Sequence, residues 1–224
     1  MDLDFSPFFK KYEELLIAAD TVFERVKGEY PDCVKCAPGC SDCCHALFDL
    51  TLIEALYLNQ HFKKKFQAQA WESLIGKANR ADRDVYKIKR KAYKDFKEGK
   101  KEDEILAEMA TERVRCPLLN ESDQCDLYEY RPITCRFYGI PTAIGGKGHT
   151  CGISGFVEGQ PYPTVNLDMI HQKLYEISES LVKEIGSKHS KMGEMLVPLS
   201  MAMLTVYDDV YLGLADEKEE AKNE

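Results

Sequence analysis

Nine cysteines in two groups constrain this chain more than any other feature of its sequence. They are Cys33, Cys36, Cys40, Cys43 and Cys44, then Cys116, Cys125, Cys135 and Cys151. An odd number of thiols cannot all pair in disulfides. Residues 1–11 carry Asp2 and Asp4 and lack the apolar stretch of a secretory signal. We therefore expect a reducing, cytoplasmic location in which the thiols bind metal.

The spacing within the first group suits metal binding. Spacers of two and three residues let neighbouring sulfurs converge on one soft metal at about 2.3 Å while the loop folds back on itself. Cys43 and Cys44 are adjacent, and neighbouring side chains in an extended or turn segment point apart. We therefore expect these two sulfurs to bind different metal atoms, which makes the site polynuclear or double.

The second group can complete such a site only through the fold. A gap of 71 residues separates Cys44 from Cys116, so the intervening helices must bring the two groups together. Neither common template fits the pattern. The second group lacks the paired knuckle of a zinc ribbon, and the bacterial ferredoxin run is absent. The residues alone leave zinc and iron–sulfur both open.

Several short motifs surround the cysteines. They are Cys36…Cys40-Ser-Asp-Cys43-Cys44, Cys116-Pro-Leu-Leu, Cys125-Asp-Leu-Tyr, Arg131-Pro-Ile-Thr-Cys135-Arg and the helix start Thr51-x-x-Glu54. Together they resemble the YkgJ-like cysteine-cluster family, the CxxCxxCC zinc- or iron-chelating domain, over roughly residues 33–152. The chain departs from the family pattern in two ways: its first spacer has three residues where two are usual, and Cys33 is additional.

The resemblance implies metal binding and suggests a ligand set, in which we favour Cys36 over Cys33. The predicted ligands are Cys36, Cys40, Cys43, Cys44, Cys116, Cys125, Cys135 and Cys151. We prefer an iron–sulfur cofactor, with a role in electron transfer, redox sensing or cluster-dependent assistance to a partner. Zinc in a structural or interaction module is the first alternative. The second is a cluster-dependent protein-modifying enzyme, because similar cysteine patterns occur in flagellin lysine methylases that carry an iron–sulfur cluster.

Two arginines are predicted to act on the metal site without binding the metal. Arg131 and Arg136 flank Cys135 in the sequence. Several thiolates around a metal leave a net negative charge, which guanidinium groups offset while donating hydrogen bonds to sulfur, and such bonds tune an iron–sulfur potential. The alternative is that both arginines form surface ion pairs of little energetic weight.

The charge distribution bears on possible partners. The chain has a net charge of −8, but residues 77–101 carry eleven basic and four acidic residues. This basic stretch is predicted to be a solvated helix face, with an unknown protein partner as the alternative. Nucleic acid is an unlikely partner by prediction, because few aromatic residues interleave with the charges. No run of 18 apolar residues is present, so no membrane segment is expected.

Apolar periodicity predicts a mainly α fold, an irregular helical bundle that frames two cysteine-rich loops. The predicted helices cover residues 7–28, 51–66, 71–99, 105–110, 167–185 and 199–211. Ser6 is the expected N-cap of the first helix, and Thr51 with Glu54 forms a capping box at the second.

The remaining predictions concern the hairpin and the domain limits. A small β-hairpin is expected within residues 137–152, with Gly145-Gly146 as its turn and Pro141 restricting its first strand to a sheet edge. One helical domain is predicted over residues 1–215, with the motif core at 33–152. Residues 216–224 are expected to be a charged, frayed tail.

Overall fold

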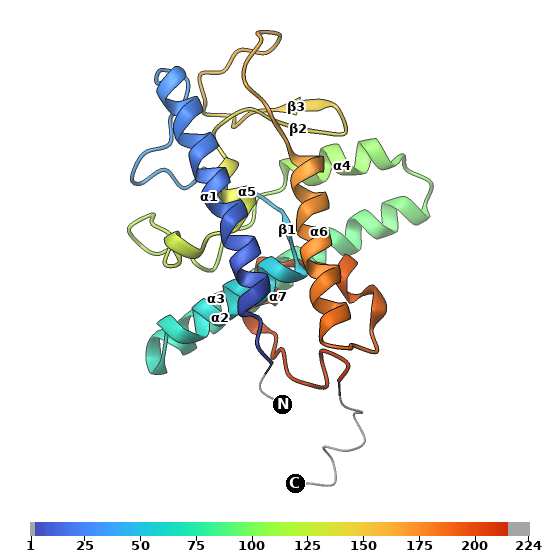
Figure 1. Cartoon of the computed structure of the whole chain (residues 1–224). Coiled ribbons are helices and arrows are strands. Elements are labelled where there is room, and N and C mark those ends of the chain that lie inside the picture. The colour runs from blue at the N-terminus through green and yellow to red at the C-terminus, as the bar shows by residue number, and fades with distance from the viewer. Residues whose placement is uncertain (1–2, 215–224) are drawn as a thin grey trace, which may run out of the picture.

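The computed structural model describes residues 3–214, and within them the chain is mainly helical (Figure 1). The α-helices are α1 (Ser6–Glu29), α2 (Leu52–Lys65), α3 (Ala68–Lys97), α4 (Glu102–Thr111), α5 (Ile133–Phe137), α6 (Leu167–Glu184) and α7 (Leu199–Leu204). Short 3-10 helices lie at η1 (Asp42–His45), η2 (Tyr128–Tyr130) and η3 (Ser190–Glu194). The predicted mainly α class is confirmed. The tail predicted at 216–224 lies outside the described residues.

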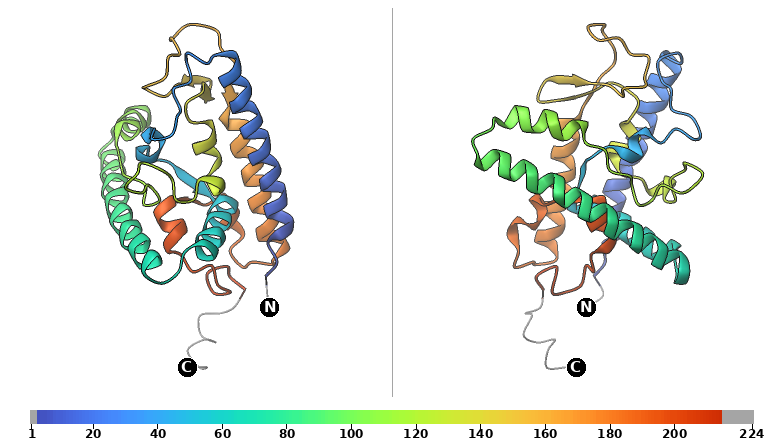
Figure 2. Two further views of the ribbon diagram at one scale, coloured as in Figure 1. Left: turned by 90° about the vertical axis from the view of Figure 1, so that its left-hand side faces the viewer. Right: turned by 180° about the vertical axis from the view of Figure 1, so that it is seen from behind.

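The helices form two walls with the cysteine segments between them. Figure 2 shows α1 and α6 running side by side on one side of the molecule, and α3 with α4 on the other. The short helices α5 and α7 lie between these walls. No helix within residues 3–214 is both long and apolar enough to span a membrane.

Two apolar clusters hold the walls together. In the first, the rings of Phe9 and Tyr12 on α1 pack edge-on against Tyr57 of α2, with centroids 5.3 and 5.1 Å apart. In the second, Phe62 of α2 stacks on Trp71 of α3 at 4.6 Å. Tyr130 and Tyr207 pack against both clusters. The α2 helix is therefore buried on most sides, because it faces both clusters.

The start of α2 confirms the predicted capping box and shows a further role for its glutamate. Oε2 of Glu54 accepts hydrogen bonds from the backbone N–H and the hydroxyl of Thr51, at 3.1 and 3.0 Å. Oε1 accepts from the N–H of Ile133, at the start of α5, at 3.1 Å, and from the Tyr12 hydroxyl at 3.5 Å. Glu54 is buried, so it anchors α5 to α2 from inside the core.

The predicted hairpin is confirmed, but its first strand is not an edge strand. Strands β2 (Thr142–Ile144) and β3 (Lys147–His149) pair antiparallel around Gly145-Gly146, whose φ angles of +56° and +76° suit a tight two-residue turn. Strand β4 (Val165–Asn166) pairs in parallel with the other side of β2. The edge prediction was wrong because Pro141 lies just outside β2 and contributes its carbonyl, which accepts the N–H of Val165 at 3.0 Å.

The sequence pattern missed a second, two-stranded sheet. Strand β1 (Asp49–Thr51) pairs antiparallel with β5 (Leu196–Pro198). The ladder joins the entrance of α2 to the entrance of α7, although nearly 150 residues of chain separate them. Three-residue strands carry too few positions for an alternating pattern, which explains the omission.

Several helix ends differ from their predictions by up to three residues, the short helix α5 was not predicted, and the last helix differs most. The last helix ends at Leu204 instead of Tyr211, because the buried amide of Asn59 donates to the carbonyls of Ala202 and Thr205 at 2.8 and 3.1 Å. Those bonds satisfy carbonyls at the helix end, where the intrahelical ladder stops. At the first helix, Phe5 occupies the N-cap position in place of Ser6.

Candidate metal centre

The two cysteine groups meet in the folded chain, as the sequence predicted. The N–H of Cys116 donates to the carbonyl of Cys44 at 2.7 Å, and the N–H of Val114 donates to the carbonyl of His45 at 3.0 Å. Ala46 and Arg113 form an antiparallel bridge in the same stretch. Two extended segments far apart in sequence therefore lie in register, with η1 directly beside Cys116.

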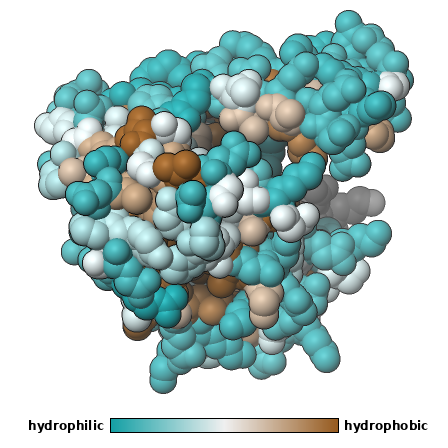
Figure 3. Space-filling view, turned by 90° about the horizontal axis from the view of Figure 1, so that it is seen from above, coloured by the Kyte–Doolittle hydropathy of each residue, from teal (hydrophilic) through white to brown (hydrophobic). Residues whose placement is uncertain are grey.

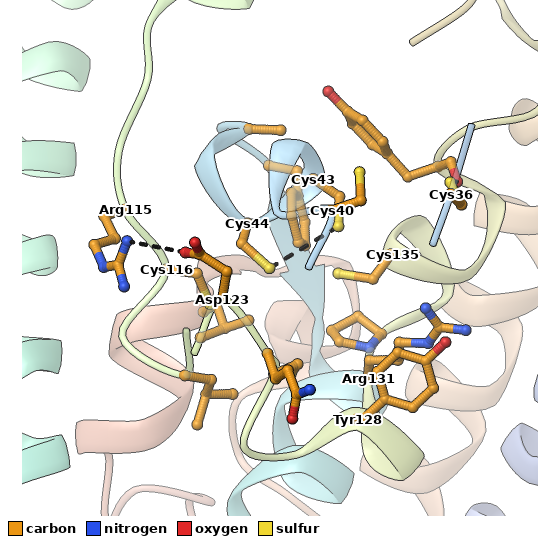
Figure 4. Close-up of a pocket in the computed structure, with 18 of the residues that line it drawn as sticks. Cys36, Cys40, Cys43, Cys44, Arg115, Cys116, Asp123, Tyr128, Arg131 and Cys135 are labelled. Carbon is orange, nitrogen blue, oxygen red and sulfur yellow. Dashed lines mark hydrogen bonds and ion pairs between the residues drawn. The ribbon is translucent and has the colours of Figure 1, made fainter. Parts of the chain in front are cut away.

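All eight cysteines of the predicted ligand set line one cavity of about 480 Å³. Figure 4 shows the side chains of Cys40, Cys43, Cys44 and Cys135 turned toward a common space, with Cys36 to one side. Across residues 3–214, no three His, Cys, Asp or Glu side chains stand in the spacing of a preformed single-metal site. The sulfurs surround a volume and do not converge on one point.

The ninth cysteine has a different environment. Both Cys33 and Cys36 pack against the first apolar cluster, but Cys33 is not among the residues that line the cavity. Its carbonyl accepts the N–H of Gly155 at 2.8 Å. The structure thus separates Cys33 from the cavity and places Cys36 at it. This placement agrees with our preference for Cys36 over Cys33, a choice that the family resemblance left open, and the ligand set itself stays a prediction.

Different elements position the cavity cysteines. Cys43 and Cys44 lie on η1, which is tightened by the hydrogen bond from the N–H of Cys44 to the carbonyl of Ser41 at 3.0 Å. Cys125 pairs with Leu119 in an isolated bridge. Cys135 is the central residue of α5. Local turns therefore place some of these thiols, whereas others depend on elements that pack from elsewhere.

The adjacent pair Cys43 and Cys44 corrects one prediction. Their Sγ atoms lie 3.9 Å apart, whereas we expected the side chains to point apart. The 3-10 turn of η1 brings the two sulfurs together, which an extended segment would not. Two ligands of one tetrahedral metal with metal–sulfur bonds of about 2.3 Å are about 3.8 Å apart. The observed spacing therefore suits a single shared metal atom.

The thiol of Cys36 contacts the backbone of Tyr138 and Gly139 directly. Its Sγ lies 3.5 Å from the carbonyl oxygen of Tyr138, to which it donates. A Cβ on the next residue, Gly139, would lie only 2.3 Å from that sulfur, and the φ angle of Gly139 is +103°. Glycine is required here both for the conformation and for the close approach.

Asp42 connects three segments around the cavity, and the sequence reasoning missed it. Its carboxylate pairs with Arg113, accepts a hydrogen bond from the Tyr138 hydroxyl at 2.9 Å, and accepts one from the Cys151 thiol at 3.4 Å. Burial alone would raise the pKa of Asp42, but these partners together lower it. The signal in the sequence was its place between Cys40 and Cys43.

The two predicted arginines occupy different places. Arg131 lines the cavity, and its guanidinium lies over the ring of Tyr128 at 4.0 Å. Arg136 is buried and points away, donating to the carboxylate of Asp20 on α1 and to the carbonyls of Glu129 and Arg131. The structure therefore brings Arg131 to the sulfurs but not Arg136.

Most of the cavity thiols resist ionisation. Burial raises the pKa of Cys36 to about 11 and that of Cys116 to about 12, and neighbouring cysteines add to both shifts. Burial also raises the pKa of Cys125, Cys135 and Cys151. Cys43 shifts the other way, because a hydrogen bond from the Cys44 thiol lowers the pKa of Cys43 to about 7. Thiolates gathered this closely are stable only beside a cation.

The donor set fits a metal or a metal–sulfur cluster. Sulfur predominates among the ligating groups on the cavity wall, where Glu24 and Asp123 are the carboxylates among the lining residues. Soft thiolate ligands select zinc, copper(I) and iron–sulfur clusters over hard cations. The chemistry of the lining residues therefore suits a group of that class.

Comparison with known proteins supports the same assignment. Residues 35–152, more than half of the chain, match the family model described as "CxxCxxCC: Putative zinc- or iron-chelating domain". Searches of curated proteins and of solved structures give no match. The sequence motifs, the meeting of the two cysteine groups and the family model agree with one another. The chain belongs to the CxxCxxCC family of zinc- or iron-chelating cysteine domains.

Proposed function

We propose that this protein holds an iron–sulfur cluster in the sulfur-lined cavity. The observation that carries the proposal is a space of about 480 Å³ surrounded by eight cysteines. A structural zinc site is closed, with four ligands at about 2.0–2.3 Å around one ion. Bridging sulfides enlarge an iron–sulfur cluster beyond that size, so a volume lined by dispersed thiols suits a cluster better.

The proposed role is electron transfer, redox sensing or cluster-dependent assistance to a partner, in the cytoplasm. All nine cysteines are free thiols of intermediate exposure, which suits a reducing compartment and a cofactor near the surface. The face in Figure 3 is mainly hydrophilic, with its apolar groups in small patches. Such a surface suits transient contacts with a redox partner.

Zinc is the second candidate, and one observation favours it. The 3.9 Å between the sulfurs of Cys43 and Cys44 matches two ligands of one tetrahedral ion. In that case the site would be structural, and metal binding would contribute folding free energy directly. An iron carrying two cysteine ligands within a cluster would give the same spacing.

Anaerobic purification followed by elemental analysis tests the proposal. We expect iron and acid-labile sulfide in similar amounts, with broad visible absorption that fades on reduction. A colourless protein with stoichiometric zinc would reject the cluster.

A matched pair of serine variants tests the ligand set. Cys135→Ser removes a thiol from the cavity wall, whereas Cys33→Ser changes a thiol that does not line the cavity. We expect Cys135→Ser to lose most of the iron and Cys33→Ser to keep it. Equal retention in both variants would contradict the placement of the site.

A further inference from the structure

One polar atom at the cavity lacks the partner that burial demands. The Nε of Arg131 is buried, and no hydrogen-bond acceptor serves it within residues 3–214. Buried N–H groups in folded proteins are almost always paired, because an unpaired one loses its bond to water without compensation. Arg131 lines the sulfur cavity, so a bound group in that cavity is in a position to supply the acceptor.

The guanidinium of Arg131 is held in place on one face. Its Cζ lies 4.0 Å from the ring centre of Tyr128, a distance at which a cation is attracted to an aromatic face. Tyr128 belongs to η2, which directly precedes Arg131. In Figure 4, Arg131 and Tyr128 lie together beside Cys135. The stacking limits the rotation of the guanidinium plane and therefore fixes the direction of its N–H groups.

The backbone of Arg131 is fixed by the second arginine. The Nε of Arg136 donates to the carbonyl of Arg131 at 3.1 Å, and another of its nitrogens donates to the carbonyl of Glu129. The remaining end of the same guanidinium pairs with Asp20 on α1. Arg136 is buried, so these contacts hold the connection between η2 and α5 against α1.

We propose that the Nε–H of Arg131 donates a hydrogen bond to a sulfur of the bound cluster, and that Arg136 and Asp20 are positioning residues that aim it. This inference rests on the proposed function. Thiolate and sulfide ligands bear negative charge and accept hydrogen bonds, and the reduced cluster bears more of that charge. The bond therefore stabilises the reduced state and raises the reduction potential.

The test compares two arginines that both line the cavity. Arg131→Lys keeps the positive charge but removes the Nε–H. Arg115→Lys is the matched control, because Arg115 is already paired with the carbonyl of Asn120 at 2.9 Å and with Asp123 at 3.9 Å. In the full chain loaded with its cluster, we expect a more negative midpoint potential for Arg131→Lys and an unchanged one for Arg115→Lys. Equal potentials for Arg131→Lys and the unsubstituted protein, at equal iron and sulfide content, would overturn the inference and leave the proposed function intact.

Two further measurements keep the inference testable if Arg131→Lys does not fold. Asp20→Asn leaves the cavity wall untouched, so a smaller shift of the potential in the same direction is expected. In the unsubstituted protein labelled with ¹⁵N-arginine, the Nε signal of Arg131 should shift when the cluster is reduced. An Nε signal that does not respond would overturn the inference. An unsubstituted protein without iron and sulfide would instead reject the proposed function.

Discussion

The two cysteine groups reach the same cavity by different physical means. In the first group, local turns position the cysteines. The N–H of Cys40 donates to the carbonyl of Ala37 at 2.9 Å, and the N–H of Cys44 donates to the carbonyl of Ser41 at 3.0 Å. In the second group, Cys125 pairs with nearby Leu119, but other members are held by residues far away in sequence. Cys116 is tied to Cys44, and Cys151 to Asp42.

This difference determines where each group is vulnerable. A local turn is specified by the residues inside it, so distant substitutions leave it in place. The position of Cys135, by contrast, depends on α5, whose first N–H donates to Glu54 of α2. We therefore expect distant substitutions to disturb the second group most. Cys36 is the exception in the first group, because its thiol contacts Tyr138 and lies against Gly139. The predictions below test this contrast in order of decreasing effect.

The largest effect is expected from Glu54→Gln. The buried carboxylate accepts four hydrogen bonds that join three helices, and the amide turns one acceptor into a donor facing other donors. We expect a loss of about 1–3 kcal/mol in the free energy of unfolding, measured by urea denaturation of the metal-free protein. Glu13→Gln is the control, because Glu13 is exposed and accepts one bond, from Tyr57 at 3.0 Å. A loss no larger than that of the control would contradict the anchoring role.

The second prediction concerns pH. Burial raises the pKa of Glu54 above its ordinary value of 4.5, despite the hydrogen bonds that favour its ionised form. Above pH 4.5 the unfolded chain therefore releases a proton that the folded chain still holds, and unfolding becomes easier as pH rises. The free energy of unfolding of the unsubstituted protein, relative to that of Glu54→Gln, should fall by about 1.4 kcal/mol per pH unit above pH 4.5. It should level off once the pH passes the raised pKa. If the free energy of unfolding of the unsubstituted protein, relative to that of Glu54→Gln, rose with pH, the prediction would be wrong.

Gly139→Ala probes the first group through a distant contact. A Cβ at this position would meet the sulfur of Cys36 at 2.3 Å, in a backbone conformation with φ of +103°. We expect a loss of about 1–3 kcal/mol in stability, together with weaker metal binding in a competition titration. Gly148→Ala is the control, since nothing lies within 4 Å of the added carbon there. If both variants bind metal equally well, the close packing of Cys36 against Gly139 does not contribute to metal binding.

The smallest effect is expected from Asp42→Asn. This change weakens the contacts to Arg113, Tyr138 and Cys151 at a partly exposed carboxylate, so we expect about 0.5–1.5 kcal/mol. The Cys151 thiol should also react faster with an alkylating reagent in the metal-free protein. Asp123→Asn, which alters a looser surface pair with Arg115, should change neither quantity. An unchanged alkylation rate of Cys151 in Asp42→Asn would argue against the hydrogen bond from the Cys151 thiol to Asp42.

Much of the helical frame could be predicted because each helix carries its own signals. The capping box at Thr51, the cap at Asn166, which accepts the N–H of Met169, and the long apolar periodicity of α3 are all local. The end of α7 was not predictable in this way. Its apolar pattern continues past Leu204, and only the amide of Asn59, folded in from α2, shows why the helix stops.

The candidate site also has features that the sequence could predict and features that depend on the fold. The spacing of the cysteines and the family motifs indicated which thiols to consider. In the structure, all eight of these cysteines line one cavity. Asp42 was overlooked because its partners Tyr138 and Cys151 lie about a hundred residues away. The approach of Cys43 to Cys44 was misjudged, since it depends on the turn that the chain adopts at η1.

Sequence by itself determined the elements whose causes are local, which are the longer helices and the hairpin turn, and it indicated which cysteines to consider as metal ligands. Only the tertiary structure decided that the two cysteine groups surround one space, that Arg131 faces it while Arg136 supports the loop behind, and that Glu54 joins α5 to the core. The physical reason is that spacing and periodicity report on neighbours along the chain. A cavity wall instead depends on long-range hydrogen bonds and packing, which only the folded molecule brings together.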